Sequence, residues 1–244
     1  MIIAIIQARM GSSRLPKKTL MDIDGTPSLK FMIDRVKKSK LIDKIVVATT
    51  NKEEDNEIVN FCYNNNIFCH RGSEDDVLDR YYQTAKEYEA KTVVRLTSDC
   101  PLIDPYLIDD TINLFIQKKV DYVANTVPPE VKKYPDGSDV EVFSFKNLNR
   151  AWIEAKDIKD REHVTFYFWK RNKDFTTAML DNKYDWGKYR ITIDYKEDIN
   201  LVRQIVGILK DQKKFGTTKE IVEILESNPE LLKINSMHSW GANW

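Results

Sequence analysis

The sequence predicts an α/β protein built on a doubly wound, mostly parallel sheet. Short apolar runs alternate with helical patterns along the first half of the 244-residue chain. The first run, Ile2–Gln7, is rich in β-branched residues and shows no polar alternation, which is typical of a strand buried on both faces. Parallel strands separated by helices need crossover connections, so we expect helices on both faces of the sheet.

The elements of the first half follow in a regular order. The expected strands are short apolar runs, namely Ile2–Gln7, Lys44–Thr49, Ile67–Cys69, Thr92–Leu96 and Asp121–Ala124. The segments between them have helical spacing and are expected at Ser28–Lys38, Glu53–Asn64, Val77–Tyr88 and Pro105–Lys118. Pro27 and Pro105 stand near helix starts, where a missing N–H group costs nothing.

After about Asn125 this alternation changes. A Pro-rich loop, which includes Pro128, Pro129 and Gly137, precedes an expected strand at Val140–Phe145. The remaining expected elements are helices near Asn147–Lys156 and Arg161–Arg171, strands at Asp174–Leu180 and Tyr189–Ile193, a helix from Glu197 to about Lys213, and a helical stretch at Thr217–Leu232. The sequence has no internal repeat and no low-complexity linker. We therefore expect one domain over 1–244, with an inserted substrate or dimerisation segment at about 126–188 and a helical tail at about 196–244.

Composition excludes several classes of protein. Apolar residues make up 42% of the chain and charged residues 31%, which is typical of a soluble globular protein. Lys+Arg and Asp+Glu number 38 each, so no net positive charge favours a polynucleotide. No apolar stretch reaches the roughly 20 residues that span a bilayer, and no signal peptide is evident, so we expect a cytoplasmic protein. The cysteines form no CxxC pair and are expected as free thiols, with Cys100 in a packing role.

The loop after the first strand predicts a phosphate site. It reads QARMGSSRLPKK and combines small residues with cations, which are Arg9, Arg14, Lys17 and Lys18. Small residues let backbone N–H groups approach an anion, and cations neutralise it from the sides. The chain has neither GxGxxG nor GxxxxGK[ST], which argues against a nicotinamide-binding domain or a P-loop enzyme. The alternative is a solvated basic turn.

Two acidic segments predict a magnesium site. In RLTSDCPLIDP, Asp99 follows a strand and should lie at the same sheet edge as the cationic loop, whereas Asp104 is expected to cap the next helix. In RITIDY, alternation sends Arg190, Thr192 and Asp194 to one face, so Asp194 is expected to meet Asp99 across one Mg²⁺. For Asp99 and for Asp194 the alternative is a helix cap.

Two further segments predict contacts to base and substrate. Arg71, Gly72 and Ser73 follow a strand and could present backbone groups to a base. The alternative is that Ser73 or Asp75 only caps the following helix. A second group pairs two acidic residues on one face with a cation and an imidazole, namely Asp139, Glu141, Arg161 and His163. A lone histidine is more often packed than catalytic, so the role of His163 stays open.

Together these motifs resemble one family. The segments QARMGSSRLPKK, RGSEDDVLDRYYQTA, RLTSDCPLIDP, GSDVEVFSF, REHVTFYFW and RITIDY are similar to the cytidylyltransferase-like family of polysaccharide biosynthesis, of the spore-coat polysaccharide protein type. More distant relatives are the 3-deoxy-manno-octulosonate and acylneuraminate cytidylyltransferases. The resemblance runs from Met1 to about Leu201, and the stretch from Thr217 onward carries no matching motif.

The resemblance implies a nucleotide-diphospho-sugar transferase (GT-A-like) fold, a homodimer, and a reaction. CTP and an acidic sugar or phosphorylated acceptor would give a CMP- or CDP-linked product and pyrophosphate, with Mg²⁺ as cofactor. The implied catalytic residues are Arg14, Lys18, Asp99 and Asp194, the last two as metal ligands. The implied nucleotide-binding residues are Gln7, Ala8, Arg9, Gly11, Ser12, Ser13, Arg14, Lys18, Thr49, Arg71, Gly72, Ser73 and Thr97. The implied substrate-binding residues are Asp139, Glu141, Arg161, His163 and Arg190.

Two departures and two rival functions accompany this resemblance. Lys17 and Ser98 stand where the family commonly has Gly. A positive φ at Lys17 would cost about 1 kcal/mol, unless the lysine adds a phosphate contact. A glycosyltransferase of the same fold would need a DxD pair, for which Asp22-Ile23-Asp24 and Asp121 are poorly placed candidates. An inactive binding subunit is the other rival.

Overall fold

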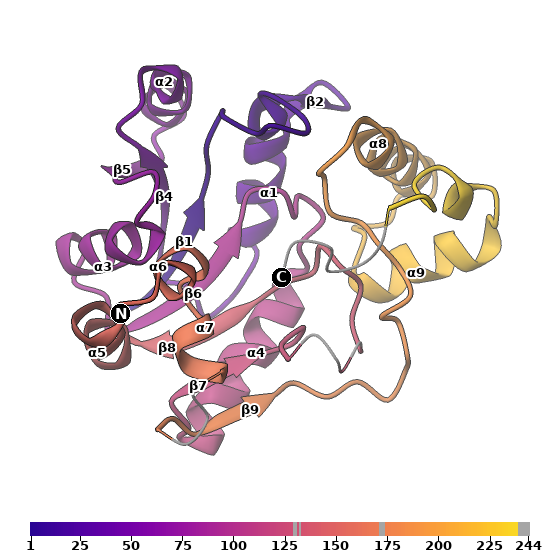
Figure 1. Cartoon of the computed structure of the whole chain (residues 1–244). Coiled ribbons are helices and arrows are strands. Elements are labelled where there is room, and N and C mark those ends of the chain that lie inside the picture. Colours follow the sequence, from indigo (N-terminus) through magenta and orange to yellow (C-terminus); the bar gives the residue numbers. More distant parts are fainter. Residues whose placement is uncertain (129–130, 132, 171–173, 239–244) are drawn as a thin grey trace.

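The computed structural model describes residues 1–128, 131, 133–170 and 174–238. Within these residues the main sheet has seven strands in the order β5-β4-β1-β6-β8-β7-β9 (Figure 1). Their bounds are β1 Ile2–Gln7, β4 Lys44–Thr50, β5 Phe68–Gly72, β6 Thr92–Thr97, β7 Tyr122–Ala124, β8 Glu141–Ser144 and β9 Thr177–Met179. A small hairpin pairs β2 (Asp22–Ile23) with β3 (Thr26–Pro27).

The sheet is mostly parallel, as predicted. Strand β1 pairs in parallel with β4 on one side and with β6 on the other, whereas β8 runs antiparallel to β6 and to β7. The chain first winds outward from β1 through β4 to β5 and then returns to place β6 on the opposite side of β1. The loops after β1 and β6 therefore diverge at a topological switch point, where doubly wound sheets bind ligands at the carboxyl ends of their strands.

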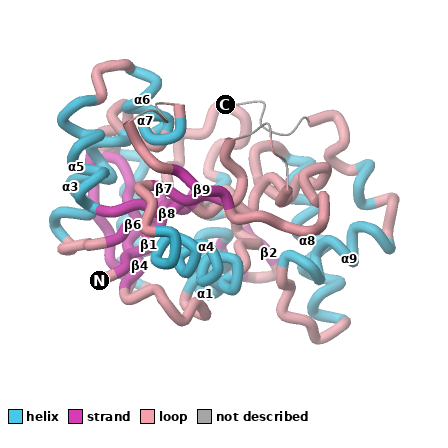
Figure 2. Tube along the Cα trace, turned by 90° about the horizontal axis from the view of Figure 1, so that it is seen from below, coloured by secondary structure: helices cyan, strands magenta, loops and turns pink. Residues whose placement is uncertain are grey.

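Helices cover both faces of the sheet, as Figures 1 and 2 show. One face carries α1 (Ser28–Val36), α2 (Asn56–Asn64) and α4 (Pro105–Lys118), whose apolar side chains pack with Ala4 and Val47 of the strands. The other face carries α3 (Val77–Glu87) and α5 (Phe145–Glu154), with the short α6 (Ile158–His163) and α7 (Phe166–Trp169) beside them. Phe166, Tyr167 and Phe168 are buried, so most of this aromatic run serves the core.

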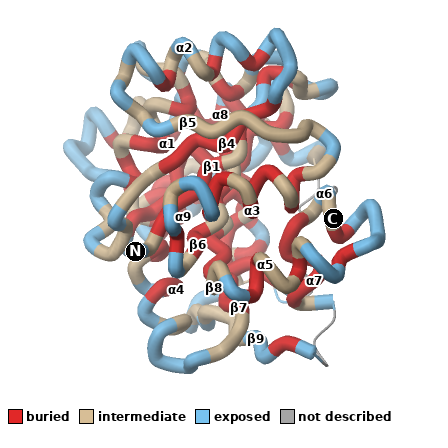
Figure 3. Tube along the Cα trace, turned by 90° about the vertical axis from the view of Figure 1, so that its left-hand side faces the viewer, coloured by how far each residue is buried: buried red, intermediate tan, exposed pale blue. Residues whose placement is uncertain are grey.

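A third apolar cluster lies beside the sheet. It joins α8 (Lys196–Asp211) and α9 (Thr218–Ser227) to the extended segment around Ile191 and Ile193 and to the β2–β3 hairpin. Figure 3 shows buried residues along the central strands and on the inward sides of the helices. Short 3₁₀ turns complete the chain at Lys18–Leu20, Glu53–Asp55 and Leu231–Lys233. Among the helices that the structure describes, none combines the length and the apolar composition that crossing a bilayer requires.

Local polar groups set the helix starts. Asp104 caps α4 as predicted, since its side chain accepts from the N–H group of Tyr106. The prediction that Ser73 or Asp75 caps α3 is wrong, because Asp76 accepts from the N–H group of Asp79 at that position. Ser73 acts one step earlier and accepts from the N–H group of Asp76.

The structure corrects the elements predicted after residue 156. The predicted helix from Arg161 is instead the pair α6 and α7, interrupted at Val164, whose φ is 59°. The predicted strand Tyr189–Ile193 is an extended segment that joins the rest by one parallel bridge between Asp136 and Arg190. Pro129, Arg171 and the end of the predicted tail at 239–244 lie outside the described residues.

A glycine holds this extended segment close to the loop before β8. Gly137 has a φ of 100°, and a Cβ atom at this position would lie 2.3 Å from the backbone nitrogen of Thr192. Only glycine fits both the conformation and the space. The close approach lets the backbone of Asp136 bond to Tyr189 and Ile191, which fixes the segment that carries Asp194.

Candidate active site

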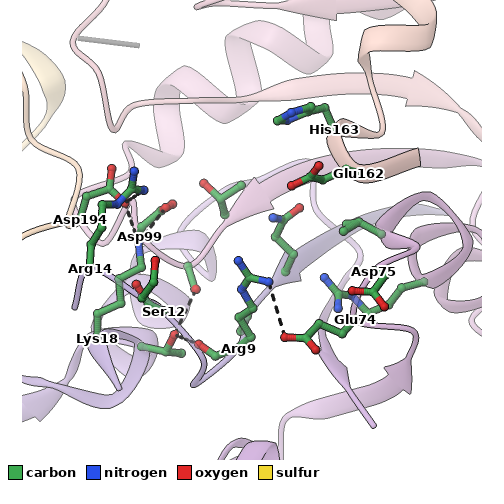
Figure 4. A pocket seen from close by; sticks show the side chains of 18 of the residues that line it. Arg9, Ser12, Arg14, Lys18, Glu74, Asp75, Asp99, Glu162, His163 and Asp194 are labelled. Carbon is green, nitrogen blue, oxygen red and sulfur yellow. Dashed lines mark hydrogen bonds and ion pairs between the residues drawn. The ribbon is translucent and has the colours of Figure 1, made fainter. Parts of the chain in front are cut away.

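A pocket of about 520 Å³ opens at the carboxyl edge of the sheet, at the switch point between β1 and β6. Its walls come from the loop after β1, the end of β6, the β5–α3 connection, α6 and the segment before α8. Figure 4 shows two ends to this pocket: one is lined by Asp99, Asp194 and Lys18, and the other by Glu74, Glu162 and His163. We call these the carboxylate end and the open end.

Lys18 lies at the centre of the carboxylate end. Its Nζ atom is 3.1 Å from Oδ2 of Asp99 and 2.9 Å from Oδ1 of Asp194, and it also donates to the carbonyl oxygen of Ile193. Arg14 Nη2 lies 3.0 Å from the same Oδ1 of Asp194. Two carboxylates that are 95 positions apart in the sequence therefore meet at one ammonium group. The sequence predicted that they share a Mg²⁺ ion, and that ion remains a prediction.

The charges at this end stabilise one another. Burial alone would raise the pKa of Asp99, but the Lys18 ammonium lowers that pKa to about 2. Burial would likewise lower the pKa of Lys18, and Asp99 and Asp194 raise it. Both groups therefore remain charged at neutral pH.

The loop after β1 turns Lys18 inward. Lys17 adopts the left-handed conformation, with a φ of 63°, directly before the 3₁₀ turn that begins at Lys18. Thr19 anchors that turn by donating to the carbonyl oxygen of Arg9. Lys17 Nζ pairs with Glu57 at 2.6 Å and does not line the pocket, so this departure from the family pattern brings the conformation of a glycine without an added phosphate contact.

Asp194 does not cap a helix. Asp198 accepts from the N–H groups of Asp194 and Tyr195 at the start of α8, which leaves the Asp194 side chain for Arg14, Lys18 and Arg190. The carbonyl oxygen of Asp99 accepts from the N–H group of Ile193, so the two carboxylate-bearing segments are also joined through their backbones.

The open end combines cations with exposed side chains. Arg80 and Arg95 are largely buried, and the Nε atom of each has no hydrogen-bond partner among the described residues. His163 stacks on Phe166 with ring centroids 4.1 Å apart, and burial and then nearby cations lower the pKa of His163. Its imidazole is therefore neutral at pH 7.

The structure brings most residues of the predicted nucleotide site to the pocket. The predicted residues that line it are Gln7, Ala8, Arg9, Ser12, Ser13, Arg14, Lys18, Thr97, Asp99, His163 and Asp194. Those that it places outside the lining are Gly11, Thr49, Arg71, Gly72, Ser73, Asp139, Glu141, Arg161 and Arg190.

The residues outside the lining have protein partners instead. Arg71 donates to the carbonyl oxygens of Thr50 and Lys52, and Gly72 packs against Arg80, whose Cγ atom would lie 3.0 Å from an added Cβ atom. Thr49 is fully buried. Gly11 lies against Glu54, whose Oε1 atom would be 2.4 Å from an added Cβ atom.

The predicted substrate group is divided in the same way. Glu141 pairs with Arg95 at 2.7 Å and also accepts from Tyr122 and Thr165, so its carboxylate is held inside the protein. Arg161 pairs with Asp76 at 2.6 Å and thereby ties α6 to the start of α3. The prediction that these two side chains contact substrate is therefore not supported by their positions.

The other two members of that group support neighbouring loops. Asp139 accepts from the hydroxyl of Thr126 and from the N–H group of Gly137. Arg190 binds Asp136, Asp194 and Asp198. Of the predicted substrate group, only His163 lines the pocket.

Ser98, which the resemblance placed near the metal, lines the pocket. The lining residues that the sequence did not assign to the site are Thr19, Glu74, Asp75, Val77, Arg80, Arg95, Ile158 and Glu162. Arg95 could have been found, because a charged residue two positions before Thr97 on an apolar strand shares its face. For Asp75 the sequence predicted only a helix cap. The two candidate DxD segments do not line the pocket: Asp24 pairs with Lys210, and Asp121 accepts from Thr176 and Asn147.

Known proteins resemble this chain over almost its whole length. A family model described as cytidylyltransferase matches residues 3–232. An uncharacterized protein of Methanocaldococcus jannaschii is 38% identical over 241 residues, which cover 96% of this chain and 94% of the relative. The spore coat polysaccharide biosynthesis protein SpsF of Bacillus subtilis is 30% identical over 236 residues, covering 94% and 95%. A 3-deoxy-manno-octulosonate cytidylyltransferase of Trichlorobacter lovleyi is 25% identical over 193 residues, covering 70% and 76%.

Solved structures share the fold. A cytidylyltransferase from Leptospira borgpetersenii superposes with a TM-score of 0.89 at 31% identity, covering 98% of this chain and 99% of the other. A CMP:2-keto-3-deoxy-manno-octonic acid synthetase complexed with CTP has a TM-score of 0.62 at 16% identity, covering 85% and 98%. The second likeness concerns the fold alone.

Proposed function

Because this chain belongs to the cytidylyltransferase family and is a nucleotidyltransferase, we propose that it transfers a cytidylyl group from CTP to an acidic sugar or a small phosphorylated acceptor. The family is the one that the motifs predicted. The names of two relatives support a role in surface polysaccharide biosynthesis and an acidic sugar as acceptor. The CTP complex of a protein with the same fold supports CTP as the donor.

One observation carries this proposal: Asp99 and Asp194 meet at Lys18 in a pocket whose same end also presents Arg14 and Ser12. Cations and small hydroxyl residues suit a triphosphate, and two converging carboxylates suit the metal ion that accompanies it. The position at the switch point is where this class of sheet binds ligands. The cations and carboxylates that phosphoryl transfer requires are therefore available at one end of the pocket.

The donor set fits a divalent cation. Mg²⁺ at phosphoryl-transfer sites uses one or two carboxylates and completes its shell with phosphate oxygens and water. Asp99 Oδ2 and Asp194 Oδ1 face the same point, which is now taken by an ammonium group. The part of the chain that the structure describes has no group of three or more Asp, Glu, His or Cys side chains suited to a metal, so substrate phosphates would supply the remaining ligands. When bound, Mg²⁺ would withdraw charge from the phosphoryl oxygens.

In the proposed reaction an acceptor oxygen attacks the α-phosphorus of CTP. A new P–O bond forms while the bond to the oxygen that bridges the α- and β-phosphates breaks, and pyrophosphate leaves with that electron pair. Arg14 and Lys18 neutralise the charge that develops on the phosphoryl oxygens, and Asp99 and Asp194 hold the metal. A phosphate or carboxylate acceptor needs no base. For a hydroxyl acceptor, the neutral imidazole of His163 is the proton acceptor at the open end.

We place the acceptor at the open end. Arg95 offers a buried guanidinium to an anion, and Glu162 and His163 offer partners to hydroxyl groups. This combination suits a nonulosonic acid, a 2-keto-3-deoxy acid, or a small phosphorylated polyol or acid.

Pyrophosphate release tests the proposal. The protein is incubated with each of the four nucleoside triphosphates and Mg²⁺, and with a panel of acidic sugars and sugar phosphates. A parallel reaction replaces the triphosphate with a nucleotide sugar. We expect release with CTP and one class of acceptor. Release of a nucleoside diphosphate from a nucleotide sugar, with no pyrophosphate from CTP, would show a glycosyltransferase instead. Metal-independent CTP binding without turnover would show an inactive subunit.

A further inference from the structure

Asp198 is the most heavily bonded carboxylate near the site. It is fully buried at the start of α8, with 0% of its surface exposed. Its Oδ2 atom accepts from the N–H group of Asp194 at 2.9 Å and from that of Tyr195 at 3.0 Å. Burial opposes its ionised form, but hydrogen bonds from Arg190 and Asn235 lower its pKa. Asp198 therefore fixes the backbone that carries Asp194.

Arg190 fixes the side chain of the same residue. Its Nη2 atom lies 3.0 Å from Oδ2 of Asp194 and 3.0 Å from Oδ2 of Asp198. Its Nη1 atom lies 2.6 Å from Asp136. Asp194 thus turns one oxygen towards Lys18 and the other towards Arg190, which leaves little freedom for its carboxylate.

A residue near the end of the described chain, Asn235, also bonds to Asp198 and Arg190. Asn235 follows the 3₁₀ turn at Leu231–Lys233 and is 6% exposed. Its Nδ2 atom donates to Oδ1 of Asp198 at 2.8 Å and to the carbonyl oxygen of Arg190 at 3.2 Å. A stretch without any recognised motif thus supplies the amide that binds both Asp198 and Arg190, the two residues that hold Asp194.

A second contact reaches the site from the same stretch. The ring of His238 stacks on Tyr195 with centroids 3.7 Å apart, and the guanidinium of Arg14 lies 5.4 Å from the centre of the Tyr195 ring. His238 also pairs with Glu197 at 3.2 Å. Residues 235–238 therefore meet the carboxylate end of the pocket through Asp198 and through Tyr195.

We infer that Asn235 is a positioning residue, which acts through Asp198 and Arg190 to hold the Asp194 carboxylate in the geometry that binds the metal and triphosphate. The inference rests on the proposed function for its effect on turnover. Without the amide, Oδ1 of Asp198 keeps, among the described residues, only its contact with Arg190, and a buried lone pair loses its donor. Asp198 can then rotate, which loosens the N–H groups of Asp194 and Tyr195.

The test replaces Asn235 and a matched asparagine. Asn235→Ala removes the amide. Asn228→Ala removes an amide whose only acceptor among the described residues is the carbonyl oxygen of Ile224, at the end of α9. Groups that orient a metal ligand change metal affinity or activity by roughly 10–100-fold, and Asn235 acts one residue further away, so we expect roughly 3–10-fold. Asn235→Ala should lower kcat and raise the half-saturating Mg²⁺ concentration by that factor, with the KM for CTP nearly unchanged. Asn228→Ala should leave these values as in the wild type.

Amide hydrogen exchange gives a readout that does not depend on turnover. We expect the N–H groups of Asp194 and Tyr195 to exchange roughly tenfold faster in Asn235→Ala and at the wild-type rate in Asn228→Ala. Asn235→Gln, which keeps the amide, should recover part of both effects and covers the case in which Asn235→Ala fails to fold.

The outcomes separate the two claims. If the wild type releases no pyrophosphate from CTP, the proposed function fails, while the exchange rates still judge the positioning of Asp194. If Asn235→Ala matches Asn228→Ala in exchange and in Mg²⁺ dependence, the inference is wrong. A uniform loss of active protein, with unchanged Mg²⁺ dependence and unchanged exchange at Asp194, would also overturn it, because it would show only a general role in stability.

Discussion

The two ends of the pocket differ in how completely their polar groups are satisfied. At the carboxylate end Lys18, Asp99 and Asp194 bind one another and lie mostly inside the protein. At the open end Ile158 is 81% exposed, and the imidazole of His163 has no hydrogen-bond partner among the residues described. The first end is organised before any ligand arrives. At the second, His163 is free for a ligand, although Glu74 already pairs with Arg9 and Lys52.

This difference assigns separate tasks to the two ends. Preorganised charges contribute most where charge develops during a reaction, because they need no rearrangement. Free donors and acceptors on a small helix such as α6 suit recognition, since they can be exchanged without disturbing the sheet. The chemistry is therefore expected to depend on the carboxylate end, and the choice of acceptor on the open end.

The largest effect should follow the loss of a carboxylate at the carboxylate end of the pocket. Asp99→Asn keeps the shape of the side chain but removes the charge that faces Lys18, and we expect pyrophosphate release to fall by about 10³-fold or more, or about 4 kcal/mol. Asp24→Asn, which changes an exposed aspartate outside the pocket, is the control. Near-normal turnover in Asp99→Asn would remove this residue from the chemistry and with it the contrast between the two ends.

The next effect is a dependence of folding stability on pH, which comes from Asp136 and Asp139 near the carboxylate end. Burial and the neighbouring Asp139 raise the pKa of Asp136 to about 7, against the attraction of Arg190. Its pKa in the folded state lies above the unfolded value near 4, so the folded state binds more protons and stability should fall as pH rises from about 4 to about 7, by about 4 kcal/mol.

Calorimetric unfolding between pH 4 and pH 8 checks this slope. Asp139→Asn removes the repulsion between the two carboxylates and should flatten the decline, whatever its effect on stability at a single pH. A wild-type stability that rises over this range would contradict the shift.

A smaller effect is expected at the open end. His163→Gln should raise the KM for the acceptor about tenfold, or about 1.4 kcal/mol, and change the KM for CTP less than about twofold. His70→Gln is the matched control, because His70 pairs with Glu87 and does not line the pocket. An equal loss with respect to both substrates would mean that the two ends are not separate in function.

The smallest effect tests the turn that delivers Lys18. Lys17 has a positive φ, so Lys17→Gly should relieve backbone strain, while Lys17→Ala keeps the Cβ atom and loses the same pair with Glu57. We expect the glycine variant to exceed the alanine variant by about 1 kcal/mol in free energy of unfolding, as measured by denaturant titration. Equal stabilities would show that the strain is negligible.

The sequence predicted the sheet and the carboxylate end because both follow from local patterns. Apolar runs mark the strands, and the polar residues after β1 and β6 must lie at one edge once those strands are parallel neighbours. Asp194 was predicted because the alternation from Arg190 holds even though the segment is not a strand. An extended backbone is enough to send successive side chains to opposite faces, even without a sheet.

The open end could not be predicted in the same way. Whether Arg161 or Arg95 lines the pocket depends on which carboxylate each one meets, and Asp76 and Glu141 come from distant parts of the chain. The interruption at Val164 that separates α6 from α7 is likewise not marked by Gly or Pro. Charged residues of the same type therefore become either internal supports or site residues through tertiary packing that no local pattern records.

The three charged groups at the carboxylate end also constrain how the molecule is made. Lys18 is separated along the chain from Asp99 by 81 positions and from Asp194 by 176, so these contacts close only after most of the polypeptide has left the ribosome. Closing such long loops is the slow part of folding, and a partly folded or truncated chain brings together cations without their acidic partners. Pyrophosphate release would thus report the yield of fully folded enzyme during refolding, at a stage when helix content is already restored.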